Sequence, residues 1–111
     1  MYEYKALVKE VYDGDTITAI VDLGFRNQTT VKFRLLGINT PELEKATKEA
    51  GIKSRDRLRE LILGKEVIIK TQKDKQEKFG RWLGEIFLPE NKLVSVNQML
   101  INEGLAVPFM I

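Results

Sequence analysis

The first third of the chain alternates between apolar and polar positions with the period of two that is typical of β-strands. Two runs rich in β-branched and aromatic residues occupy Tyr4–Tyr12 and Thr16–Val21. Asp13-Gly14 separates them, and because glycine tolerates a positive φ, this pair predicts a tight primed turn within a hairpin. The segment Asp22–Thr29 is predicted to be a second hairpin loop, which leads into an alternating strand at Thr30–Leu36.

The apolar period changes after this third strand. Gly37–Glu42 interrupts the pattern, because Pro41 cannot donate a hydrogen bond to a strand ladder. Apolar positions then recur at helical spacing from about Lys48 to Leu63, and Gly64 is the predicted C-terminal stop. The helix face that is expected to be buried consists of Ile52, Arg55, Leu58, Leu61 and Ile62.

The last third of the chain is predicted to contain two more strands and a short helix. The strands are Glu66–Thr71 and Trp82–Leu88, joined by the charged stretch Gln72–Gly80, and the helix is Val96–Glu103, ended by Gly104. The resulting order, β-β-β-α-β-β-α, predicts an α+β, mainly β domain over residues 1–111. We expect a five-stranded OB-fold-like barrel with flanking helices, because barrel closure removes exposed strand edges.

Composition narrows the class of protein. The chain has 111 residues, of which 43% are hydrophobic and 31% are charged, as expected for one globular domain. No run approaches the roughly 20 apolar residues that span a bilayer, so no membrane partner is expected. Charges close to the first residue predict that the chain has no signal peptide, and they leave its compartment open.

The sequence contains 0 Cys and 0 His. Zinc sites with thiolate or imidazole ligands, disulfides, Cys nucleophiles and His-based triads are therefore excluded. Chemistry must depend on carboxylates, Arg, Lys, hydroxyls, backbone groups or a hard metal bound by oxygen. The formal net charge of +2 permits a polyanionic partner without demanding one.

Unusual polar chemistry is concentrated in Asp13–Thr16, Arg34–Glu42 and Lys78–Leu83. If the barrel brings these segments together, oxygen ligands for a cation would lie beside two guanidinium groups. Such a cation holds a phosphate oxygen and helps to generate a nucleophilic water. Arginine forks stabilise the charge of the transition state, and a nearby carboxylate accepts the proton of the water.

Each segment by itself also has a simpler structural interpretation. Asp-Gly is usually only a turn, and Arg34 on a strand is usually solvated. Thr40-Pro41 suits the cap and first position of a helix. Phe79 and Trp82 are more often core residues, and the lysines between residues 72 and 80 are more often a solvated loop. Periodicity and composition alone predict only a small mixed β-barrel domain.

The balance between the structural and the functional interpretation changes because four motifs occur in order. They are D-G-D-T, R-L-L-G-I-N-T-P-E, F-G-R-W-L and V-N-Q-M-L-I-N-E-G-L-A. Together they resemble the staphylococcal nuclease (thermonuclease-like, SNase-like) family from about Val8 to Ala106. The resemblance implies an OB-fold barrel with helices. It also implies a Ca²⁺-dependent endonuclease, a hydrolase that cleaves phosphodiester bonds of single-stranded DNA and RNA.

The resemblance also implies a set of ligands for one Ca²⁺ ion. Asp15 would be a direct ligand through its side chain, and Thr40 would be another through its backbone carbonyl. Asn39 stands where active members usually have a second ligand Asp. Asp13 would lie in the outer shell of the metal.

Three catalytic and two substrate-binding residues are implied in the same way. Arg34 would hold the scissile phosphate, and Arg81 would hold it from the other side and stabilise the transition state. Glu42 would deprotonate or orient the attacking water. Lys78 and Phe79 match positions that contact the nucleotide.

Two departures from the family pattern leave alternatives open. Asn39 brings no charge, so weaker Ca²⁺ binding is expected. The alternative is a catalytically weakened SNase-like module that binds nucleic acid or protein, and a third possibility is a structural barrel in a larger assembly. The chain stops at Val107–Ile111, where relatives commonly continue, so the third C-terminal helix is expected to be absent. We expect a monomer or weak dimer.

Overall fold

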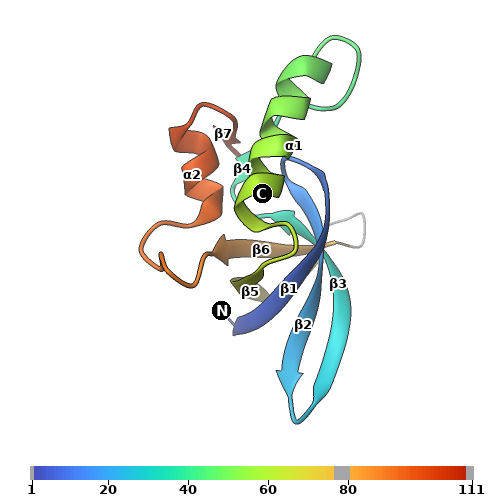
Figure 1. Ribbon diagram of the computed structural model, residues 1–111, viewed down its shortest axis with the longest axis vertical. Helices are drawn as coiled ribbons and strands as arrows, with labels where there is room; N and C mark the ends of the chain where they lie inside the picture. The colour runs from blue at the N-terminus through green and yellow to red at the C-terminus, as the bar shows by residue number, and fades with distance from the viewer. Residues whose placement is uncertain (1, 77–80, 110–111) are drawn as a thin grey trace.

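The computed structural model describes residues 2–76 and 81–109 of the chain. Its main element is a closed five-stranded barrel, as the sequence predicts, and the order of its strands is β1-β2-β3-β6-β5. The barrel strands are β1 (Tyr2–Asp13), β2 (Thr16–Gly24), β3 (Asn27–Leu35), β5 (Glu66–Gln76) and β6 (Trp82–Phe87). Two helices, α1 (Lys48–Ile62) and α2 (Val96–Asn102), lie beside the barrel (Figure 1). The described part of the chain contains no third helix.

A parallel pairing between β3 and β6 closes the barrel. Phe33 pairs with Trp82 and Leu35 with Gly84, whereas the other neighbouring barrel strands are antiparallel. The register of this pairing places the end of β3 beside the first residues of β6. The polar segments around Arg34 and Arg81 are therefore brought together, although they are far apart in the sequence.

The core is formed by inward-facing side chains of the strands and by one face of each helix. The barrel contributes fully buried residues such as Val8, Ile17 and Ile69. Leu58 from α1 and Leu100 from α2 are equally inaccessible and join the same cluster. Buried and exposed positions alternate along the strands because successive side chains point to opposite faces of the barrel wall, as the sequence pattern indicates. In the described part of the chain, no helix is long and apolar enough to cross a membrane.

The predicted loop at Asp22–Thr29 is wrong. The ladder between β2 and β3 continues through Asp22 and Gln28, and the connection is the two residues Phe25 and Arg26. Their φ angles are 54° and 63°, a left-handed conformation that hairpin turns usually fill with Asn, Asp or Gly. Because Phe and Arg carry no such signal, the sequence pattern does not reveal this turn.

The expected role of Gly14 is also wrong. Its φ lies outside the left-handed region, so the turn between β1 and β2 does not depend on a positive φ. The requirement is steric. A Cβ at Gly14 would lie 2.8 Å from the Cβ atoms of both Ser54 and Thr40.

The buried face of α1 differs in part from the expected one. Leu58, Leu61 and Ile62 are buried as predicted, but Ile52 and Arg55 are only partly buried. Their expected places are taken by the small residues Gly51 and Ser54. A Cβ at Gly51 would lie 2.7 Å from the carbonyl oxygen of Glu42. Small side chains therefore let α1 approach the loop that follows β4.

A small second sheet was not predicted. It pairs β4 (Ile38–Asn39) with β7 (Val107–Pro108), within segments where the sequence pattern indicates a break and a short tail. The ladder of β5 also extends five residues beyond the predicted end at Thr71. The remaining boundaries agree with the predicted ones to within about two residues, as is usual for element ends.

Candidate functional site

A hollow of about 460 Å³ lies where the β1–β2 turn, the end of β3, the segment after β4 and the start of β6 meet. Every predicted site residue that the structure describes lines it, namely Asp13, Asp15, Arg34, Asn39, Thr40, Glu42 and Arg81. The structure thus brings together the three polar segments of the sequence. Lys78 and Phe79 lie outside the described residues.

Asp15 is a buried carboxylate with several donors around it. Its Oδ2 accepts a hydrogen bond from the backbone N–H of Thr40 at 3.2 Å, and its Oδ1 accepts one from the hydroxyl of Thr16 at 3.2 Å. The Nη2 of Arg34 lies 3.7 Å from Oδ2. Only 8% of Asp15 is exposed, so these contacts hold its negative charge in a fixed direction.

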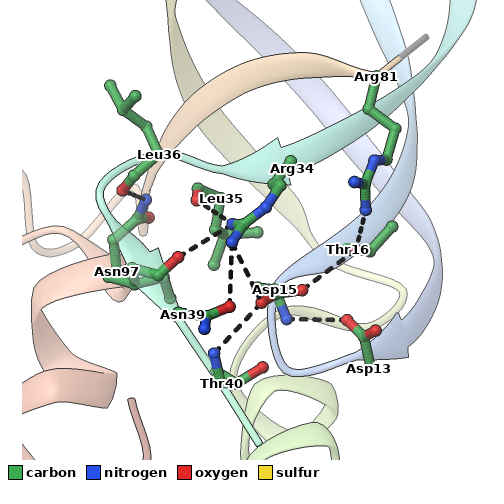
Figure 2. A network of polar contacts seen from close by, with 11 residues as sticks. Asp13, Asp15, Thr16, Arg34, Leu35, Leu36, Asn39, Thr40, Arg81 and Asn97 are labelled. Carbon is green, nitrogen blue, oxygen red and sulfur yellow. Dashed lines mark hydrogen bonds and ion pairs between the residues drawn. The ribbon is translucent and has the colours of Figure 1, made fainter. Parts of the chain in front are cut away.

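Arg34 is held in place by oxygen atoms on two sides (Figure 2). Its Nη1 donates to the carbonyl oxygens of Leu35 at 3.0 Å and Ile38 at 2.9 Å, and its Nη2 donates to the Oδ1 of Asn39 at 3.2 Å. Arg34 is therefore a buried cation that bridges the turn between β3 and β4, and not a solvated strand residue. Within the described chain its Nε–H makes no hydrogen bond.

Asp13 lies next to Asp15 in the β1–β2 turn. Its Oδ1 accepts the backbone N–H of Asp15 at 3.0 Å. Burial raises the pKa of Asp13 above its ordinary value of 3.8, and the negative charge of Asp15 raises it further. The hydrogen bond from the Asp15 N–H acts in the opposite direction. Two carboxylates at one turn produce a local negative potential that a cation would relieve.

Glu42 and Arg81 lie on other parts of the wall. Glu42 is exposed, and its carbonyl oxygen accepts a hydrogen bond from the hydroxyl of Thr47 at 2.7 Å, which helps to hold the loop. Arg81 extends from the start of β6, and its Nη1 donates to the Oγ1 of Thr16 at 3.0 Å. Because Thr16 in turn donates to Asp15, Figure 2 shows one connected polar network from Arg81 to Asp13.

The oxygen atoms of this hollow agree in kind with a hard divalent cation. Calcium accepts carboxylate, amide and backbone carbonyl oxygens, which Asp15, Asn39 and Thr40 possess. Within residues 2–76 and 81–109, no three Asp, Glu, His or Cys side chains are grouped closely enough to form a metal cluster by themselves. Such an ion would therefore be held by a mixed set of oxygens, in which few atoms carry charge.

Asn97 is a supporting residue that the sequence analysis missed. Its Oδ1 accepts the backbone N–H of Ile86 at 3.0 Å, and its Nδ2 donates to the carbonyl oxygens of Leu36 at 2.8 Å and Gly84 at 3.2 Å. It thereby connects α2 to β6 and to the turn that follows Arg34. An Asn at a position of the helix that the apolar spacing of Val96 and Leu100 assigns to the core side is the signal that could have identified it.

Comparisons with known proteins place the chain in a family. A sequence profile described as "Staphylococcal nuclease homologue" matches residues 32–111. The chain is also similar to an uncharacterized protein of Methanocaldococcus jannaschii, with 31% identity over 125 aligned positions. That alignment covers 93% of this chain and 58% of the relative, so the chain spans little more than half the length of that protein.

Proposed function

Because the chain belongs to the staphylococcal nuclease homologue family, we propose that it is a metal-dependent nuclease that hydrolyses phosphodiester bonds of single-stranded DNA or RNA. Domains of this family are nucleases or nucleic-acid-binding modules. The observation that carries the proposal is the convergence of Asp15, Arg34, Asn39, Thr40 and Arg81 on one hollow. The guanidinium groups of Arg34 and Arg81, beside oriented oxygen atoms, suit a substrate that carries one negative charge per phosphodiester.

The two arginines bind the phosphate in this proposal. Arg34 uses its Nε–H, because its Nη atoms are already engaged with backbone and side-chain oxygens. Arg81 approaches from the start of β6 and binds a second non-bridging oxygen. Hydrogen bonds already hold both guanidinium groups before the reaction begins, so both stabilise the extra charge of the transition state with little reorganisation.

Glu42 accepts the proton of the attacking water. Its carboxylate is exposed at the edge of the hollow and makes no hydrogen bond or ion pair with the described residues. A carboxylate in this position can act as a general base. A role that is limited to orienting the water is the alternative for this residue.

One Ca²⁺ ion would be held by the Asp15 carboxylate, the Asn39 amide oxygen and the Thr40 carbonyl oxygen, with Asp13 behind them. When bound, such an ion supplies positive charge to the phosphate and makes a coordinated water more acidic. Asn39 contributes no charge, so we expect the affinity for Ca²⁺ to be lower than with two carboxylates. Arg34 also competes for the same amide oxygen.

Three further assignments belong to the same proposal. Lys78 and Phe79 contact the nucleotide. Residues 1–111 act as a single domain, and the protein is a monomer or a weak dimer.

The deciding experiment is cleavage of an end-labelled single-stranded DNA across a Ca²⁺ titration. We expect cutting that stops with a chelator and falls by about 10²-fold or more in Arg81→Ala, the scale seen when one transition-state donor is removed. Arg55→Ala is the matched control, because Arg55 lies on α1 and pairs with Asp56. Cutting that is equally fast with the chelator, or in Arg81→Ala, would contradict the proposal.

Asn39 is the specific observation that favours a second function, a module that binds nucleic acid or protein without cutting it. In that case the oligonucleotide binds and remains intact at every Ca²⁺ concentration. Asn39→Asp separates the two functions. A weak nuclease gains Ca²⁺ affinity and rate with the restored carboxylate, whereas a binding module gains little.

A further inference from the structure

The C-terminal end of the described chain lies against the candidate site. In the small second sheet, Val107 pairs with Asn39, and Pro108 pairs with Ile38. The next residue, Phe109, donates its backbone N–H to the carbonyl oxygen of Gly37 at 2.8 Å. These backbone contacts fix the position of Phe109 beside the same segment that binds the guanidinium of Arg34.

The ring of Phe109 lies over that guanidinium. The Cζ atom of Arg34 is 5.5 Å from the ring centroid, within the range of a cation–π contact. Phe109 also lines the hollow that contains Asp15, Glu42 and Arg81. The side chain of Arg34 is only 10% exposed, whereas Phe109 remains 45% exposed, so Phe109 is a wall of the site and not a core residue.

The hydrogen bonds of the guanidinium are made by its Nη atoms. The oxygens of Leu35, Ile38 and Asn39 bind donors at the edge of the group. An aromatic ring adds contact on a flat face and keeps water from it, which strengthens the neighbouring polar contacts. The ring therefore restrains the tilt of the plane, and this tilt decides where the remaining Nε–H points.

We propose that Phe109 is a positioning residue, whose ring, carried by the β4–β7 pairing, holds the Arg34 guanidinium in the orientation that presents its Nε–H to the phosphate. The C-terminal strand is then part of the site, although it supplies no group that reacts. This inference rests on the proposed role of Arg34 in phosphate binding.

The kinetic test is a double-mutant cycle between Phe109 and Arg34. We expect Phe109→Leu to lower kcat/KM by about 3- to 30-fold, the range that corresponds to one partly desolvated cation–π contact. Phe109→Tyr retains an aromatic face and should keep most of the activity. In an Arg34→Ala background, Phe109→Leu should lower the residual rate less than about twofold, because contacts that act through one another are not additive.

The matched control is Phe25→Leu. Phe25 lies in the β2–β3 turn, is 98% exposed and does not line the hollow. The same change in side chain there should leave kcat/KM unchanged. Thermal unfolding of Phe109→Leu and Phe109→Tyr shows whether both variants are folded at the assay temperature.

A measurement that needs no activity is the NMR signal of the Arg34 Nε–H. The ring of Phe109 shifts this signal, so Phe109→Leu should move and broaden it, and Phe25→Leu should leave it unchanged. An Arg34 signal that is the same in Phe109→Leu overturns the inference, as do additive losses in the cycle. If the wild-type protein binds the oligonucleotide without cutting it, the nuclease proposal fails, and the same cycle measured on binding affinity decides the role of Phe109.

Discussion

Arg34 and Asn39 are the pair of side chains on which the candidate site most depends. The 3.2 Å hydrogen bond from Nη2 to Oδ1 gives the amide oxygen two possible partners, the guanidinium and a bound cation. A neutral amide satisfies Arg34 less strongly than a carboxylate and also attracts a cation less strongly. The residue at position 39 therefore sets the charge balance of the whole network.

Asn39→Asp should lower the half-saturating Ca²⁺ concentration by about tenfold, since a charge a few ångströms from a partly screened ion is worth ~1–4 kcal/mol. The measurement is a Ca²⁺ titration followed by the rise in melting temperature. Asn27→Asp is the matched control, because Asn27 is exposed in the β2–β3 hairpin. If Asn39→Asp leaves the half-saturating concentration unchanged, the amide is not a ligand.

At the scale of elements, Asn97 on α2 connects β6 to the turn after β3. This amide is 3% exposed, and it satisfies backbone groups in β6 and in the turn after β3. Both α2 and α1 therefore stabilise the segments that carry the site, α2 through this amide and α1 through its close approach at Gly51 and Ser54.

Asn97→Leu should lower the free energy of unfolding by about 3 kcal/mol or more. It leaves the Ile86 N–H and the carbonyl oxygens of Leu36 and Gly84 without these partners, and each such loss costs ~1–3 kcal/mol when the group stays buried. Urea unfolding measures the change. Asn102→Leu on the same helix should shift stability by no more than about 0.5 kcal/mol, because Asn102 is exposed and, among the described residues, its side chain bonds only to Gln98. Equal losses in both variants would contradict this role.

The two helices are also joined by an ion pair. Arg57 donates to both carboxylate oxygens of Glu103, at 2.8 and 3.1 Å, and this hydrogen bonding lowers the pKa of Glu103 below its ordinary 4.5. A depressed carboxylate pKa stabilises the fold above pH 4.5, and this contribution is lost as the pH falls through the folded-state pKa.

Glu103→Gln should therefore reduce stability at neutral pH by only about 0.5 kcal/mol, because the pair is exposed. The difference from wild type should shrink as the pH falls below 4.5 through the lowered folded-state pKa of Glu103, because the carboxyl then becomes protonated in both states. Urea unfolding at neutral and at acidic pH checks this dependence. A difference that persists in acid would mean that Glu103 acts through packing and not through its charge.

At the scale of the whole molecule, the strand topology contributes more to the proposed binding of nucleic acid than the net charge does. Lys and Arg number 18 against 16 Asp and Glu, so a broad basic surface is not expected to attract nucleic acid. The parallel β3–β6 pairing instead gathers Arg34 and Arg81 at one place. Binding should depend on a few local contacts.

The salt dependence of nucleic-acid binding distinguishes a few local contacts from a broad basic surface. Two phosphate contacts predict a slope of log K against log salt of about −1.4 for single-stranded DNA, and Arg81→Ala should reduce its magnitude by about 0.7. Fluorescence anisotropy with a chelator present follows binding without cleavage. Lys92→Ala, an exposed lysine that does not line the hollow, is the control. A slope steeper than about −5 would indicate contacts over a much wider surface.

Most of the fold could be predicted from local patterns. The period of two in β1 to β3 and the helical period near Leu58 arise because one face of each element is buried. This requirement determines which positions within a short segment are apolar, so it can be recognised in the sequence. The turn at Phe25 and Arg26 could not be predicted in this way. Its conformation depends on the strand pairing on both sides and not on the preferences of those two residues.

The sequence by itself determined the barrel, its helices, the family and the identity of the candidate site residues, because periodicity and ordered motifs are properties of neighbouring positions. Only the tertiary structure decided that Arg34 is buried, that Asn39 bonds to it, and that Phe109 covers it. It also decided that Gly14 is needed for space and not for a positive φ. The contact of Phe109 with Arg34 and the crowding of Gly14 by Ser54 join segments far apart in the chain, and such contacts exist only after the chain has folded.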